Sequence, residues 1–254
     1  MGSVYLGRSA TGEPVAIKVV RADYAADADF RRLFEREARI ARRVPRFCTA
    51  AVLDSGDDGG RLCLVTEYID GPTLHDDVRA HGPLDAGRLE RLAVSVATAL
   101  TAIHSVNAVH RDLKPSNVLL AADGARVIDF GIAVALDAST HLTHVVRGTP
   151  TYMAPEQASG RQPVGPPADI FAWGGVVVFA ATGRPPFGTG KPEAMLYRVV
   201  HEAPDLTGVP EPLRAIVAEA MNRDPSRRPT AAELHHRLVT AAAPSSVTVC
   251  LPLW

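Results

Sequence analysis

The sequence predicts an α+β fold in which a small β-rich lobe precedes a larger, mostly helical lobe. Strands with alternating polarity and one helical period fill the first 70 residues. The segment IDGPT then breaks the pattern, which places a lobe boundary near residues 70–73. Helical periodicity dominates beyond it. We therefore expect a first lobe over residues 1–70, a second over 71–240 and a tail over 241–254.

The first lobe opens with a predicted β-hairpin. Residues 3–8 and 15–20 read as strands around a turn at Gly12. In the second strand Lys18 shares a face with Ala16, because successive side chains of a strand point to opposite faces. The stretch RLCLVTEY is the clearer member of a later strand pair.

A helix is predicted over residues 29–43, where apolar side chains recur on one face. This stripe comprises Phe30, Leu33, Phe34, Ala38 and Ala41. Glu37 falls inside the stripe. Because an unpaired buried carboxylate is costly, we expect Glu37 to pair with a cation, and Lys18 is the nearest candidate upstream.

The second lobe is predicted to contain five main helices. They cover residues 84–105, 169–182, 191–201, 212–221 and 231–239. The most apolar of them contains IFAWGGVVVFAAT, which is well short of the roughly 20 residues that span a bilayer. We interpret it as a buried core helix and expect no membrane segment.

Composition limits the classes of function. The chain has 254 residues, 46% of them hydrophobic, and a net charge of −1, which argues against a dedicated nucleic-acid binder. Seven arginines nevertheless fall between Arg31 and Arg46. A solvated helix face is the favoured interpretation, with a protein docking surface as the alternative. No secretion signal is visible, so a cytoplasmic location is expected.

The three cysteines have no metal-binding spacing. We interpret Cys48, Cys63 and Cys250 as reduced packing residues.

One stretch concentrates chemically capable side chains: HRDLKPSNVLLAADGARVIDFG, residues 110–131. Its two apolar runs flank an Asp-Gly pair, a strong hairpin signal. Folding that hairpin brings Asn117 and Asp129 together, and their hard oxygen atoms suit Mg²⁺. Asp112 and Lys114 enter the same space, as a candidate base and a candidate phosphate-facing cation.

In this stretch and around it the chain resembles the protein kinase family. The motifs VAIK, HRDLKPSN, DFG, APE, DIFAWG and RRPT follow one another in the family's order across residues 1–240. The segments SVYLG, EYIDGPTL and GTPTYMAPEQ are most similar to bacterial Ser/Thr kinases of eukaryotic type. The resemblance implies a two-lobed kinase fold that uses ATP and Mg²⁺, with Mn²⁺ as an alternative metal.

The resemblance also implies catalytic roles. Lys18, paired with Glu37, would hold the α- and β-phosphates of ATP, while Asn117 and Asp129 would hold the metal. Asp112 would accept the proton of the attacking hydroxyl, and Lys114 would neutralise the transferring phosphoryl group. Thr149 would support the substrate and Lys114.

The same resemblance implies a nucleotide pocket. Adenine would lie between Val4 and Ala16 on one side and Leu119 on the other. Thr66 would be the gatekeeper, and Glu67 and Ile69 would offer backbone hydrogen bonds. Of the family's phosphate loop, G-x-G-x-x-G-x-V, only Gly2 and Val4 remain, so we expect the first strand to be missing, the next strand to form an exposed apolar edge, and ATP binding to be weakened.

Regulatory and scaffold residues follow in the same way. Ser139, Thr140 and Thr143 occupy the activation-loop position, and a phosphate on Thr143 is expected to pair with Arg111. Glu156 and Arg228 are expected to form a buried ion pair, and Asp169 to fix the backbone near His110.

The predicted function is transfer of the γ-phosphoryl group of Mg-ATP to Ser/Thr hydroxyls of proteins, including the chain's own activation loop, with a homodimer as the partner for phosphorylation in trans. One alternative is a kinase-like scaffold without turnover, which the incomplete phosphate loop favours. Another is a small-molecule phosphotransferase, which the APE and substrate-loop features disfavour.

Overall fold

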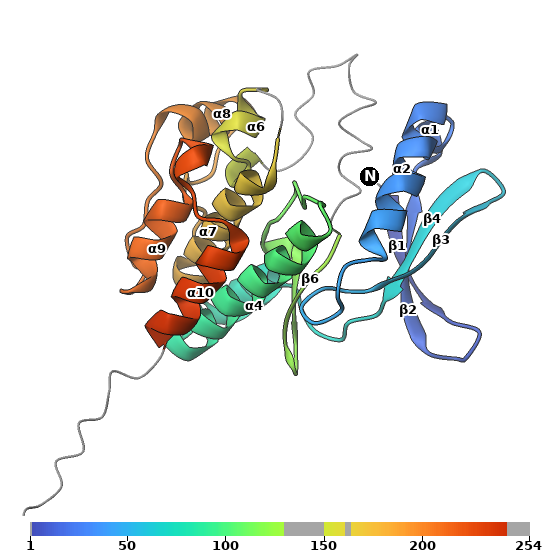
Figure 1. Ribbon diagram of the computed structural model, residues 1–254, viewed down its shortest axis with the longest axis horizontal. Coiled ribbons are helices and arrows are strands. Elements are labelled where there is room, and N and C mark those ends of the chain that lie inside the picture. The colour runs from blue at the N-terminus through green and yellow to red at the C-terminus, as the bar shows by residue number, and fades with distance from the viewer. Residues whose placement is uncertain (1, 130–149, 161–163, 243–254) are drawn as a thin grey trace, which may run out of the picture.

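Two lobes follow one another along the chain in the computed structural model, which describes residues 2–129, 150–160 and 164–242. Figure 1 shows a β-rich lobe built from the N-terminal part of the chain beside a larger helical lobe. The predicted α+β architecture is confirmed.

The N-terminal lobe is built on a four-stranded antiparallel sheet of order β1-β2-β4-β3. Its strands are β1 (Gly2–Arg8), β2 (Pro14–Val20), β3 (Val52–Asp58) and β4 (Arg61–Glu67). Ala16 lies opposite Thr66 and Lys18 opposite Leu64. β1 pairs only with β2 among the described strands, and its Val4, Tyr5 and Leu6 side chains are exposed. The expected apolar edge is therefore present.

Two helices belong to this lobe, α1 (Ala22–Ala25) and α2 (Ala28–Ala41). Asp27 caps α2 by accepting hydrogen bonds from the backbone N–H groups of Asp29 and Phe30. The predicted stripe is buried except for Leu33, which is half-buried. The α2 helix thus ends two residues before the predicted limit and packs its apolar face into the lobe's core.

The C-terminal lobe is helical apart from one small hairpin. Its longer helices are α3 (Leu74–His81), α4 (Ala86–Ser105), α7 (Pro166–Thr182), α8 (Pro192–His201), α9 (Leu213–Ala220) and α10 (Ala231–Ala242). The shorter elements are η1 (Pro115–Asn117), β5 (Val118–Ala121), β6 (Gly124–Val127), η2 (Pro150–Tyr152), α6 (Pro155–Ala158) and η3 (Pro225–Arg227). The α3 helix was absent from the predicted set.

The centre of this lobe is α7, whose residues 168–180 are all buried. The Trp173 indole N–H donates to the Ala93 carbonyl of α4 at 3.0 Å, and α10 also packs against α4. The interpretation of the apolar run as a core helix is confirmed. Within the described residues, no helix combines the length and apolarity that crossing a membrane requires.

Candidate active site

A buried carboxylate of α7 fixes the loop that carries the candidate catalytic residues. Asp169 is 1% exposed and accepts hydrogen bonds from the backbone N–H groups of His110 and Arg111, both at 2.8 Å. His104 Nε2 lies 2.8 Å from the same side chain. The expectation that Asp169 holds the backbone near His110 is confirmed, whereas the contribution of His104 was not predicted. Three partners for one carboxylate make this anchor rigid.

Three polar side chains converge at the end of this loop. Lys114 Nζ lies 2.8 Å from Asp112 Oδ2. The Asn117 amide donates to the Asp112 carbonyl at 2.8 Å and also reaches Asp112 Oδ2 at 3.3 Å. The side chains of Asp112 and Lys114 are partly exposed, at 23% and 22%. A carboxylate is thus held beside a cation with an open side toward solvent, an arrangement suited to proton acceptance next to phosphate.

The β5–β6 hairpin brings Asn117 and Asp129 to the same end, as predicted. Val118 lies opposite Val127, and the Ile128 N–H donates to the Asn117 carbonyl at 3.0 Å. Asp129 follows immediately in a left-handed conformation with φ of 63°. The described residues contain no cluster of three His, Cys, Asp or Glu side chains that could hold a metal. Mg²⁺ does not need one, because it binds through one or two protein groups together with phosphates and water.

The structure pairs Lys18 with Asp129, and the predicted pairing with Glu37 is wrong for this conformation. Lys18 Nζ lies 3.0 Å from Asp129 Oδ2, which joins the two lobes. In the described part of the chain no ion pair joins Lys18 to Glu37. Both carboxylates lie far from Lys18 in sequence, so the choice between them depends on how the lobes meet. Sequence periodicity carries no information on that.

Glu37 itself is buried, as expected from its place in the apolar stripe. It is 8% exposed, and burial raises the pKa of its carboxyl above the ordinary 4.5. The positive charges of Arg111 and Arg36 partly offset that rise in pKa. Glu37 is therefore a buried acid that lacks the ammonium partner expected for it.

Arg111 links the catalytic loop to the segment beyond the undescribed region. Its carbonyl accepts from Gln157 Nε2 at 3.0 Å, and its own φ is 65°. The Arg111 Nε is buried and has no hydrogen-bond partner among the residues that the structure describes. This unmet donor suits an anion, as predicted for a phosphate. The predicted sites Ser139, Thr140, Thr143 and Thr149 lie outside the described residues.

The residues predicted to surround adenine come from both lobes. Val4 and Ala16 lie on β1 and β2, and Thr66 lies directly opposite Ala16 on β4. Leu119 lies on β5, where it bridges to Thr73 at the start of α3. The Glu67 N–H already donates to the Ala51 carbonyl at 2.9 Å, which leaves the Glu67 carbonyl as its candidate contact. Ile69 lies in the segment that joins the lobes.

Gly2 is held at a close approach between strands. A Cβ atom at this position would lie 2.0 Å from the Val19 carbonyl oxygen, so only glycine fits here without a backbone shift.

The predicted scaffold ion pair is confirmed. Arg228 contacts both carboxylate oxygens of Glu156, at 2.7 and 2.8 Å. It also donates to the carbonyls of Asn222, Pro167 and Arg223 and lies over the Phe171 ring. The pair holds the α6 segment on the C-terminal lobe.

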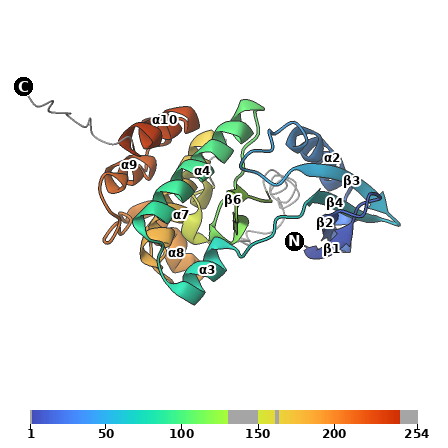
Figure 2. The same cartoon turned by 90° about the horizontal axis from the view of Figure 1, so that it is seen from below.

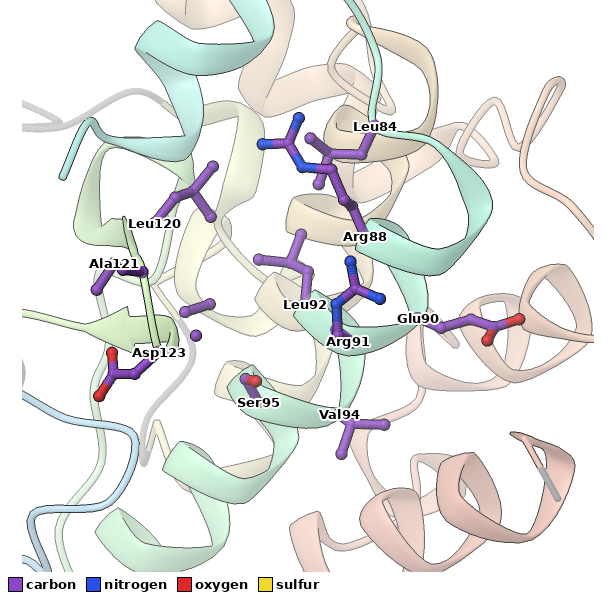
Figure 3. A pocket seen from close by; sticks show the side chains of 13 residues that line it. Leu84, Arg88, Glu90, Arg91, Leu92, Val94, Ser95, Leu120, Ala121 and Asp123 are labelled. Carbon is purple, nitrogen blue, oxygen red and sulfur yellow. The ribbon is translucent and has the colours of Figure 1, made fainter.

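A separate groove of about 570 Å³ lies between α4 and the turn of the β5–β6 hairpin. Figure 3 shows Arg88 and Arg91 of α4 in this groove, with Leu120 and Asp123 on the hairpin side. None of the predicted site residues lines it. We therefore do not assign the nucleotide to this groove.

The sequence model of a family described as "Protein kinase domain" matches residues 1–239. Serine/threonine-protein kinase AfsK of Streptomyces coelicolor is 45% identical over 239 residues, covering 94% of this chain and 30% of that protein. The probable serine/threonine-protein kinase PkwA of Thermomonospora curvata is 45% identical over 241 residues, covering 94% and 32%. The chain spans about a third of the length of these curated relatives.

A solved structure gives the same fold. The crystal structure of the Mycobacterium tuberculosis PknI kinase domain superposes with a TM-score of 0.75 at 27% identity, over 95% of this chain and 92% of that one.

Proposed function

We propose that this chain, which belongs to the protein kinase family, transfers the γ-phosphoryl group of ATP to serine or threonine hydroxyls of proteins. The observation that carries the proposal is the cluster of Asp112, Lys114 and Asn117 on a loop anchored by Asp169. The relatives named as serine/threonine-protein kinases support the choice of hydroxyl. They lend no support to a scaffold without turnover.

In the proposed reaction Asp112 accepts the proton of the attacking hydroxyl. Its carboxylate has the required open side, and the Asn117 amide holds its backbone in place. Lys114, at 2.8 Å from that carboxylate, would stabilise the negative charge that develops on the transferred group. The two residues thus act as base and as electrostatic stabiliser.

Asn117 and Asp129 would hold the metal. They offer an amide oxygen and a carboxylate at the same end of the β5–β6 hairpin, which fits the oxygen preference of Mg²⁺ and does not distinguish it from Mn²⁺. The bound ion would neutralise phosphate charge during transfer.

Lys18 changes partner in this proposal. In the structure it contacts Asp129 at 3.0 Å, while Glu37 lies buried without it. With Asp129 holding the metal, Lys18 would be free to contact the α- and β-phosphates and Glu37. Burial disfavours the ionised form of Glu37, and a nearby ammonium group would stabilise that form.

The finer assignments are part of the proposal. Thr149 supports the substrate, and phosphorylation of Thr143, with Thr140 as the alternative site, supplies the anion for Arg111. We also include a homodimer for phosphorylation in trans and a cytoplasmic location. The adenine contacts of Val4, Ala16, Thr66, Glu67, Ile69 and Leu119 belong here as well.

The test is incubation with labelled ATP, Mg²⁺ and a generic protein substrate, followed by identification of the phosphorylated amino acids. We expect phosphoserine or phosphothreonine with the unaltered chain. Nucleotide binding without any transfer would support the scaffold instead. Label that appears only on small hydroxyl compounds would support a small-molecule phosphotransferase.

A further inference from the structure

The exposed face of α2 carries a row of arginines that the proposed reaction does not use. Arg32, Arg36 and Arg39 share one side of α2, and Arg43 continues their spacing in the turn that follows the helix end at Ala41. We call these four residues the α2 stripe. All four are exposed, and they lie opposite the buried face formed by Phe30, Phe34, Ala38 and Ala41.

Most of the stripe has no ionic partner of its own. Arg31 and Arg42, on the flank of α2, pair with Asp57 and Asp54 of β3 at 2.5 and 2.6 Å. Within the stripe, Arg32 pairs with Asp29. Arg36, Arg39 and Arg43 make no ion pair or side-chain hydrogen bond with any residue that the structure describes.

An exposed aromatic side chain follows the stripe in the chain. Phe47 is 81% exposed, the largest value among the large apolar side chains of the described residues. Its neighbour Arg46 is exposed as well, and the Arg46 carbonyl accepts a hydrogen bond from Arg126 of β6. The Phe47 turn is thus fixed against the second lobe while its ring faces solvent.

Nothing that the structure describes covers this side of α2. Figure 2 shows α2 with the sheet on one side and no other described element on the opposite side. Residues 29–47 hold seven arginines against three acids, although the whole chain has a net charge of −1. Positive charge is therefore concentrated in this segment rather than spread evenly over the protein.

We propose that the α2 stripe and Phe47 form a docking surface for an acidic helical segment of a partner protein. Arg36 and Arg39 lie on α2 and Arg43 lies in the turn just beyond it, so the three unpaired arginines extend over roughly 10 Å at a rise of about 1.5 Å per residue. Carboxylates at positions i, i+3 and i+7 of a facing helix have the same spacing. Guanidinium groups suit them, because they bind carboxylates through two parallel hydrogen bonds. An apolar side chain on the partner would cover Phe47.

A protein fits this surface better than a nucleic acid does. Nucleic-acid binding typically neutralises about 6 to 10 phosphates, and the stripe offers three unpaired cations. Carboxylates also border it, with Asp29 and Glu35 on α2 and Asp54 and Asp57 on β3. These acids repel a continuous polyanion that runs past the stripe. They do not prevent three separate carboxylates on a partner helix from facing the three unpaired arginines.

The probe for a direct test is a fluorescent synthetic helix of about 20 residues with glutamates at i, i+3 and i+7 and a leucine one turn later. A second peptide with glutamines at those positions is its control. Binding is measured by anisotropy without ATP, so a failure of kinase activity does not affect the result. We expect the glutamate peptide to bind at least about tenfold more tightly, and this preference to fall with added salt.

The protein variants then locate the site. The variant R36E/R39E/R43E reverses the charge of the three unpaired arginines of the stripe. It should weaken binding of the glutamate peptide by at least about tenfold, since the three ion pairs with the peptide are lost. Reversal of three exposed arginines on the other lobe, R79E/R91E/R184E, changes net charge equally and should alter binding by less than about threefold. Phe47→Ala should weaken binding with all stripe charges intact.

Equal losses in the two triple variants would overturn the proposal, as would equal binding of the two peptides. Stripe-dependent binding of duplex DNA or of anionic lipid vesicles tighter than that of the peptide would also overturn it, in favour of that other partner. If the triple reversal lowers the melting temperature, R36Q/R39Q/R43Q replaces it, because this variant removes the charges without placing acids on one helix.

Discussion

The two lobes hold their charged groups in opposite ways. In the C-terminal lobe, two buried charged side chains each bind several partners: Asp169 binds three donors, and Arg228 binds Glu156 and three carbonyls. In the N-terminal lobe, Glu37 is buried without its expected cation, and Lys18 reaches across to the other lobe. The C-terminal lobe thus supplies the residues of the proposed reaction that are held in place. The N-terminal lobe supplies Lys18 and Glu37, which are proposed to change partner.

The largest effect is expected at Asp112 on the fixed side. Asp112→Asn removes the proton acceptor but keeps the size of the side chain, so phosphoryl transfer should fall by about 10² to 10⁴. Nucleotide binding should change little, because Asp112 is not proposed to contact ATP. Rates with labelled ATP and calorimetric titration with Mg-ATP check the two statements. A loss of rate below about tenfold would remove Asp112 from the role of base.

The next largest effect concerns stability. Glu156→Gln leaves Arg228, whose side chain is fully buried, without its charge partner, and breaking a buried pair in this way costs about 3 to 5 kcal/mol of unfolding free energy. Chemical denaturation of both proteins measures the difference. A cost below about 1 kcal/mol would show that the C-terminal lobe does not depend on its paired charges.

The sequence predicts contacts between neighbouring residues better than contacts between distant ones. The Asp-Gly turn and the flanking apolar runs correctly predicted that Asn117 and Asp129 meet, because a hairpin is specified by neighbouring residues. The partner of Lys18 was predicted wrongly, because that contact depends on the packing of one lobe on the other. Local signals therefore predicted the geometry of the hairpin but not which of two distant carboxylates Lys18 contacts.

A local signal was also overlooked. Helix α3 has only two apolar residues on its buried face, Leu74 and Val78, so its periodicity is weak. Its start is nevertheless marked by Thr73, whose hydroxyl accepts from the Asp76 N–H at 3.1 Å. A capping residue followed three positions later by an acid would have predicted this helix.

The buried Glu37 of the N-terminal lobe should make the free energy of unfolding depend on pH. Because burial raises its pKa in the folded state, the stability it confers is fully present below about 4.5 and is lost as pH rises through the folded pKa. Glu37→Gln does not titrate, so the variant should gain stability relative to the unaltered protein between acidic and neutral pH. Urea unfolding at a series of pH values measures this.

Glu35→Gln is the matched control, since Glu35 is exposed on the same helix. It should show a much smaller pH-dependent difference. A Glu37→Gln variant that loses stability on going to neutral pH would mean that Glu37 has a cation partner in the resting protein, and the contrast between the lobes would fail.

The smallest effect is expected at the surface of the N-terminal lobe. Arg42 and Asp54 are 2.6 Å apart, but their side chains are 41% and 73% exposed, so water and salt screen their attraction. Asp54→Ala should therefore cost less than about 1 kcal/mol of unfolding free energy, and less again at high salt. The same variant releases Arg42 beside the α2 stripe, so it should bind the acidic helix slightly more tightly than the unaltered chain. A cost that equals that of Glu156→Gln would mean that surface pairs hold this lobe as strongly as buried pairs hold the other.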